Sequence, residues 1–206
     1  MPLRAARLGA AAQAGGDREL TAAGALLARA ERSGTARDWL AFIAALADAG
    51  RPLEAVRHLR LLWRGVPASA ALGEAGALDR SVFLLNGGAI ALDTGLRAVG
   101  GLWCALARSS PHPDVRYLAG ANLGAGAARR ERALRPDTVL EATSLLVEVV
   151  ATGAADEAAA AVADLEGMVA VAPRALPPRI GLARALREAG RAAQAAEQAE
   201  RAVAAA

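Results

Sequence analysis

Side chains that could do chemistry are few in this chain, and the sequence separates them widely. There are two histidines, His58 and His112, and one cysteine, Cys104. A structural zinc site takes four ligands, and a catalytic triad needs a base beside its nucleophile. This set fits neither pattern, and the segment GLWCALA predicts that Cys104 is a small buried apolar residue. The sequence also has no phosphate loop and no dinucleotide fingerprint, so we expect no catalysis, no metal and no cofactor.

The two asparagines, Asn86 and Asn122, are the first candidates for contact with a partner. An asparagine amide both donates and accepts hydrogen bonds, so it can hold the backbone of a bound peptide. Asparagine is also favoured in caps and turns. Both interpretations stay open at this point.

Charged candidates lie at the ends of predicted helices and in the last part of the chain. Asp48 and Asp93 each end a predicted helix, where an anion opposes the helix dipole. They could receive a cationic group of a ligand, or serve only as solvated surface residues. Arg184 and Arg187 could bind a carboxylate. Alternatively Arg184 pairs with Glu188, four residues on, and only supports its helix.

The overall charge gives little support to a nucleic-acid partner. All 24 basic residues are arginine, and they face 21 acidic residues, which leaves a net charge of +3. The densest basic cluster, AARRERALRP at 127–136, contains no aromatic residue on which a base could stack. Nucleic acid is therefore an improbable partner.

Composition predicts an all-α protein. Hydrophobic residues make up 54% of the chain, much of it alanine, and aromatic residues only 3%. Alanine is the best helix former. The sequence contains no run of about 18 apolar residues, so we expect no membrane span. The first residues do not resemble a signal peptide. One cysteine suits a reducing compartment, so we expect a cytoplasmic protein.

Two nearly identical phrases, DAGRPLEAVRHL at 48–59 and EAGRAAQAAEQA at 188–199, indicate a repeated helical hairpin. In the first, an apolar stripe precedes Gly50, Pro52 stands where a second helix can begin, and another stripe follows. Glycine turns recur along the chain, at Gly16, Gly50, Gly95, Gly153 and Gly190.

Large and small residues within the predicted helices indicate how the hairpins pack. Trp39, Trp63 and Trp103 are expected in the core between helices. The pairs Gly87-Gly88 and Gly100-Gly101 suit two helices that cross closely, because a bulky side chain there would hold them apart.

A spacing of roughly 34 residues with two helices per unit resembles the tetratricopeptide repeat (TPR) family. The resemblance is closest at 36–69, through Trp39, Gly50-Arg51, Ala55 and Pro67, and it covers most of the chain. It implies one repeat domain over 1–206, a right-handed α-solenoid of about five to six TPR-like helical hairpins. The expected units are 2–34, 36–69, 81–113, a degenerate 114–136, 139–173 and 176–206, with an insertion at 66–80.

The resemblance also implies a concave groove lined by the first helix of each hairpin. We therefore expect a scaffold that binds a protein or peptide there. The groove candidates are Asn86, Asn122, Asp48, Asp93, Arg184 and Arg187. The alternative is a regulatory module that binds a small ligand between Phe83, Trp103 and Tyr117. Self-association stays open too, because the last unit has no evident polar capping helix.

Overall fold

The regular structure of the described residues is helical throughout. The computed structural model describes residues 21–64, 76–124, 134 and 136–205, and these contain no strand. This confirms the all-α class for that part of the chain. Residues 21–33 are helical, and the elements that follow are α2 (Ala36–Asp48), α3 (Pro52–Trp63), α4 (Gly76–Thr94), α5 (Arg97–Ala107), α6 (Pro113–Gly124), the short 3-10 helix η2 (Pro136–Thr138), α8 (Val139–Thr152), α9 (Ala155–Val171), α10 (Leu176–Glu188) and α11 (Ala192–Val203).

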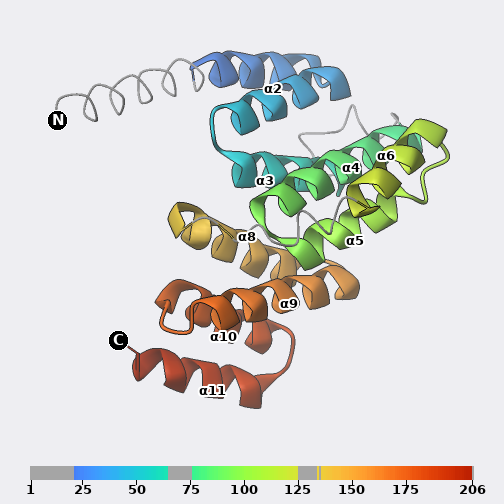
Figure 1. Ribbon diagram of the computed structural model, residues 1–206. Helices are drawn as coiled ribbons and strands as arrows, with labels where there is room; N and C mark the ends of the chain where they lie inside the picture. Colours follow the sequence, from blue (N-terminus) through green and yellow to red (C-terminus); the bar gives the residue numbers. More distant parts are fainter. Residues whose placement is uncertain (1–20, 65–75, 125–133, 135, 206) are drawn as a thin grey trace, which may run out of the picture.

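Consecutive helices pack against each other along most of the chain. α2 packs on α3, α3 on α4, and α4 on α5, while α8 packs on α9 and α10, and α10 on α11. The helices follow one another from residues 21–33 at one end of the molecule to α11 at the other (Figure 1). The interior is one apolar cluster that runs from Ala23 to Ala195.

The two similar phrases of the sequence form the same turn. Gly50 and Gly190 adopt φ values of +77° and +74°, a conformation that glycine reaches without a Cβ clash. In each case the residue after the glycine donates to a carbonyl five residues earlier: Arg51 N–H to Leu46 O at 2.9 Å, and Arg191 N–H to Leu186 O at 2.8 Å. This is the helix-ending pattern that glycine favours. The repeated phrase thus encodes a repeated turn.

Small residues allow α4 and α5 to cross closely, as the sequence predicted. A Cβ on Gly88 would lie 3.0 Å from the carbonyl oxygen of Gly100, and a Cβ on Gly100 would lie 2.9 Å from that of Gly88. A Cβ on Gly87 would meet the Trp63 ring at 2.8 Å. Gly101 differs, because it has nothing within 4 Å of a Cβ, so its predicted packing role is wrong.

The three tryptophans and Cys104 are buried, as expected from the sequence. Trp63 and Trp103 meet edge to face, with ring centroids 4.7 Å apart. They join α3 to α5 across α4. Within the core, this ring contact links α3 and α5.

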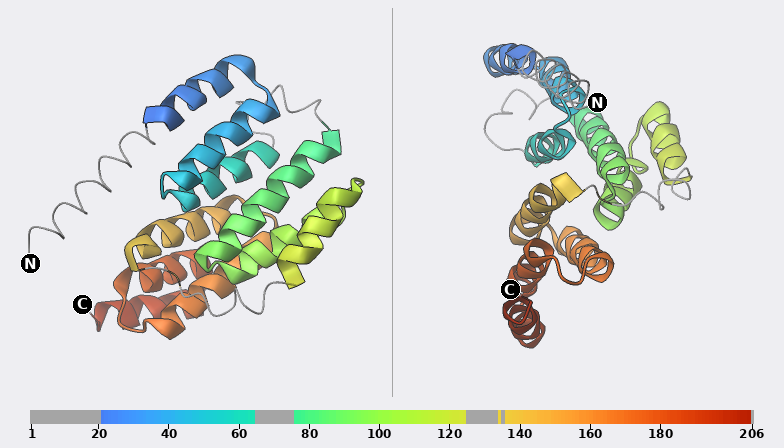
Figure 2. Two further views of the ribbon diagram at one scale, coloured as in Figure 1. Left: turned by 45° about the horizontal axis from the view of Figure 1, so that its top comes forward. Right: turned by 60° about the vertical axis from the view of Figure 1, so that its left-hand side comes forward.

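Helix α6 leaves the succession of packed helices. It contacts α5 and α4, and the α8–α9 pair then packs against α3 and α5 instead of following α6. Figure 2 shows α6 standing to one side of the other helices. Residues far apart in sequence therefore become neighbours where α3 meets α8.

The expected insertion at 66–80 is wrong over its last residues, because α4 begins at Gly76. Residues 65–75 lie outside the described part, as do 1–20 of the first expected unit and 125–133 of the degenerate one. The predicted turn at Gly16 and the proline at 67 fall in these ranges.

Candidate binding groove

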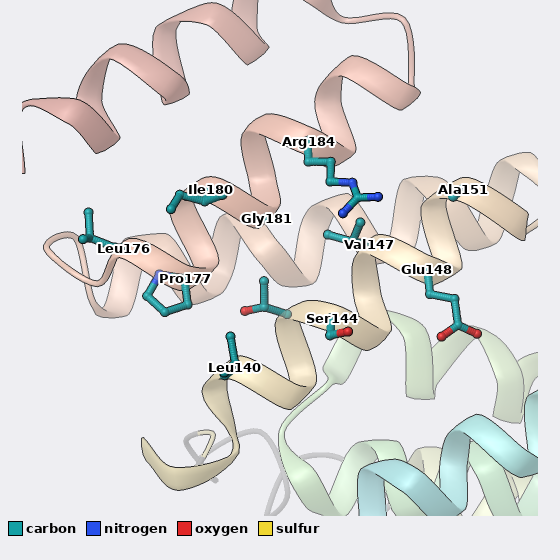
Figure 3. Close-up of a pocket in the computed structure, with 11 residues that line it drawn as sticks. Leu140, Ser144, Val147, Glu148, Ala151, Leu176, Pro177, Ile180, Gly181 and Arg184 are labelled. Carbon is teal, nitrogen blue, oxygen red and sulfur yellow. The ribbon is translucent and has the colours of Figure 1, made fainter. Parts of the chain in front are cut away.

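A groove runs between α8 and α10. Its volume is about 600 Å³. Its walls consist mostly of apolar and small residues. They also include two side chains with hydroxyl groups and two charged side chains. The lining residues are Leu140, Thr143, Ser144, Val147, Glu148, Ala151, Leu176, Pro177, Ile180, Gly181 and Arg184 (Figure 3).

The floor of the groove forms because glycine lets α10 approach α8. A Cβ on Gly181 would lie 2.3 Å from Cγ2 of Thr143, which is too close for any side chain. The Thr143 hydroxyl donates back to the Val139 carbonyl at 2.8 Å, as threonine often does within a helix. Val147 and Gly181 are buried beneath the opening.

Two large apolar side chains stand exposed on opposite walls. Leu140 of α8 is 69% exposed and Ile180 of α10 is 56% exposed. Beside Ile180, the neighbouring Arg179 is buried, where it donates to Gln198 Oε1 at 3.0 Å and to the Pro173 carbonyl. The arginine is thus covered and the isoleucine open to solvent, the reverse of their usual preference. This makes the wall a candidate contact surface.

The other end of the groove is charged. Arg184 is exposed there, and among the described residues no carboxylate pairs with it. Glu188, its expected partner, lies 3.7 Å from Arg187 instead. Glu148 also lines this end, but its carboxylate already accepts from Arg57 Nε at 2.9 Å and lies 3.5 Å from Arg60.

A second hollow, of about 500 Å³, lies between α10 and α11 and adjoins the groove. Arg184 lines both, and Arg187 lines the second. The remaining lining residues are alanines, Ala183, Ala192, Ala195, Ala196 and Ala199. Arg184 therefore stands between two apolar hollows.

Next to the charged end of the groove, α8 belongs to a partly buried polar cluster that we call the joint. It consists of Arg57 and Arg60 of α3, Arg64 directly after that helix, Trp103 of α5, Glu148 and Thr152 of α8, and Glu157 of α9. Two of its charged side chains are almost wholly covered: that of Arg60 is 1% exposed and that of Glu157 is 7% exposed.

Within the joint, Glu157 is the shared acceptor. Its carboxylate receives Trp103 Nε1 at 3.0 Å, Arg64 at 2.7 Å and the Ala154 N–H at 3.1 Å. Arg60 donates to the Thr152 hydroxyl at 2.9 Å. Burial lowers the pKa of Arg60, and the neighbouring carboxylates oppose that effect, so the guanidinium stays charged. Most of these groups are bonded to one another, although Arg60 Nε is buried without a hydrogen-bond partner, 4.0 Å from Glu157 Oε1. The pairing favours a structural role.

A second polar contact, made by Asp164 of α9, joins α9 to α5. Its two carboxylate oxygens accept from the N–H groups of Ala98 and Val99, each at 2.9 Å. These are free donors of the first turn of α5, so Asp164 caps that helix from another element. Burial raises the pKa of Asp164, and the N–H donors act in the opposite direction.

The residues proposed from the sequence do not gather in one place. Arg184 lines the groove and Arg187 the adjoining hollow. Asn86 lies within α4 and Asn122 within α6, both half-buried. Asp48 and Asp93 are exposed near the ends of α2 and α4. None of these four lines the groove or the adjoining hollow.

The small-ligand pocket expected between Phe83, Trp103 and Tyr117 does not form. Phe83 and Trp103 are buried in the core, whereas Tyr117 on α6 is exposed to solvent. The reason is that α6 presents this ring away from its contact with α5. The described residues contain no cluster of three or more His, Cys, Asp or Glu that could hold a metal ion.

Sequence reasoning missed Leu140 and Ile180. A signal was present for both. The buried stripe of α10 runs through Leu182, Ala185 and Leu186, and Ile180 stands two positions before it, about 200° around the helix. An apolar residue off the stripe of an amphipathic helix is a candidate for external contact. Leu140 has the same offset from Ala142.

Comparison with known proteins gives no relative for this chain: no family model, no curated protein and no solved structure matches it. Within the described residues, none of the helices has the length and apolar character needed to cross a membrane.

Proposed function

We propose that the protein is a binding scaffold that holds an apolar segment of a partner protein in the groove between α8 and α10. The observation that carries this proposal is the pair Leu140 and Ile180, exposed on facing walls of a hollow of about 600 Å³. Leaving such side chains in water costs free energy that a partner's apolar residues would recover, at roughly 25 cal/mol per Å² of apolar surface covered.

The finer architecture belongs to the same proposal. Glycine-turned hairpins whose helices pack in succession support a right-handed TPR-like solenoid, in which α8 and α10 would be the first helices of their hairpins. In such a solenoid a groove between first helices would be the concave binding surface. The departure of α6 would mark the degenerate unit. The sequence contains one cysteine, Cys104, and it is buried, which fits residence in the reducing cytoplasm.

A peptide-binding experiment tests this function. A random peptide library displayed on phage is panned against the full chain, and enriched peptides are measured individually by fluorescence anisotropy. Ile180→Asp should weaken them at least tenfold, because a carboxylate would face the apolar wall. The matched control is Val171→Asp, since Val171 is 79% exposed on α9 and lines neither hollow.

Two results contradict the proposal. One is that no peptide is enriched above background. The other is that the enriched peptides bind wild type and Ile180→Asp equally, which would place their site elsewhere on the molecule.

A further inference from the structure

The groove has two chemically different ends, and the difference indicates which partner it accepts. Leu140, Leu176, Pro177 and Ile180 surround one end, and Arg184 and Glu148 the other (Figure 3). A bound segment lying along the groove therefore meets apolar side chains first and charged groups afterwards.

The charged end has an excess of positive charge. Glu148 is the acidic residue that lines it, and Arg57 and Arg60 already approach its carboxylate. Arg184 lines the same end and is exposed, and no carboxylate of the described residues pairs with it.

The position of Arg184 allows a segment to pass over it. It lines both the groove and the alanine-walled hollow next to α11. A cationic partner would have to compete with two arginines for Glu148. An anionic partner would gain an interaction with an arginine that is exposed and ready to form a two-pronged hydrogen bond to a carboxylate.

We propose that the groove selects protein segments in which large apolar residues are followed by an acidic residue whose carboxylate binds Arg184. This inference rests on the function proposed above and names its partner's chemistry. The apolar residues would lie between Leu140 and Ile180, and the acidic residue would lie at the junction with the second hollow. Charge complementarity gives direction and selectivity, and apolar contact gives most of the affinity.

The test uses charge exchange between peptide and protein. For each peptide that Ile180→Asp weakens, its acidic residue is changed to lysine, and binding is measured to wild type and to Arg184→Glu. We expect about tenfold weaker binding when either side alone is changed, and recovery of binding when both are changed. Binding of the unchanged peptide should also weaken as salt increases.

The control is Arg37→Glu, which alters the net charge of the protein equally at an exposed position on α2. It should leave affinity unchanged. Peptides that depend on Ile180 but bind equally well with either charge, or bind Arg184→Glu as tightly as wild type, overturn this inference alone. A library that gives no peptide dependent on Ile180 overturns the proposed function, and this inference with it.

Discussion

Helix α8 borders two regions of different chemistry. Towards α3 and α9 it contributes Glu148 and Thr152 to the joint, where partly buried polar groups pair at hydrogen-bond distance. Towards α10 it contributes Leu140 and Val147 to an open apolar groove. The joint covers two charged side chains, Arg60 and Glu157, almost wholly, and the groove leaves apolar side chains exposed to water.

The difference separates what holds this protein together from what it offers to others. Buried charges are costly unless they are paired, so the joint is sensitive to loss of any partner. Exposed apolar residues contribute little to folding, so the groove can change without unfolding the chain. Three substitutions test this separation, and a fourth tests the packing of His58 in α3. They are arranged by the size of the expected effect.

The largest effect is expected from Glu157→Ala in the joint. It removes the acceptor of Trp103 and Arg64 and leaves Arg60 buried with less compensation. We expect a loss of about 3 kcal/mol in the free energy of unfolding, measured by urea denaturation. The control is Glu166→Ala, which breaks an exposed ion pair with Arg191 and should cost less than about 1 kcal/mol. Equal losses in both variants would mean that the joint is not a special contact.

The next effect concerns the floor of the groove. Gly181→Ala places a methyl group against Cγ2 of Thr143, and we expect a loss of about 1 to 3 kcal/mol from the overpacking. Thr143→Ser removes that Cγ2, so the double variant should recover most of the loss.

The matched control for Gly181→Ala is Gly167→Ala. Gly167 is exposed in α9 and has nothing within 4 Å of a Cβ, so alanine there should stabilise the helix by up to about 1 kcal/mol. If both alanine variants gain stability, the close approach of α10 to α8 is wrong.

A smaller effect is the dependence of the free energy of unfolding on pH through His58. This side chain packs against Phe42 with ring centroids 5.0 Å apart. Burial lowers the pKa of His58 below its ordinary value of 6.5. The unfolded chain therefore binds a proton more readily, and stability should fall as pH drops below about 6.5 until the folded state also becomes protonated. His58→Gln should reduce this dependence in urea titrations between pH 7.5 and 5.5. An unaltered pH profile would assign the dependence to other groups.

The smallest effect is expected from Ile180→Asp in the absence of a partner. The side chain is largely exposed, so the free energy of unfolding should change by no more than about 0.5 kcal/mol. Urea denaturation beside wild type measures this. A loss as large as that of Glu157→Ala would show that Ile180 belongs to the core, and the groove would lose its main support.

Local signals in the sequence predicted the helices well, because their causes are local. Glycine turns at Gly50 and Gly190 and the alanine-rich helices follow from backbone sterics and propensity. The crossing at Gly88 and Gly100 was also readable, since small residues in facing helices have few other uses.

The sequence does not predict the joint or the groove, because both depend on which helices meet. Arg60 and Glu157 look like ordinary surface residues of their helices, and only the displacement of α6 brings α3 onto α8 and α9 to bury them. Asn86 was chosen by residue type, and type alone does not reveal which face a neighbouring helix leaves open. The sequence predicts Arg184 because an arginine can bind a carboxylate, and it does not single out Ile180 because an apolar residue in a helix is expected in the core.

The joint has a consequence for the order of folding. Three of its hydrogen bonds connect residues 91, 92 and 93 positions apart in the chain, and the bond from Trp103 to Glu157 spans 54 positions, whereas the hairpin turns connect near neighbours. Bringing such distant segments together requires a large loss of chain entropy before any contact compensates it. The hairpins before and after α6 can gain their local contacts first. The docking of α8 and α9 onto α3 and α5 through Arg60 and Glu157 would then be the slow and late event that completes the native protein.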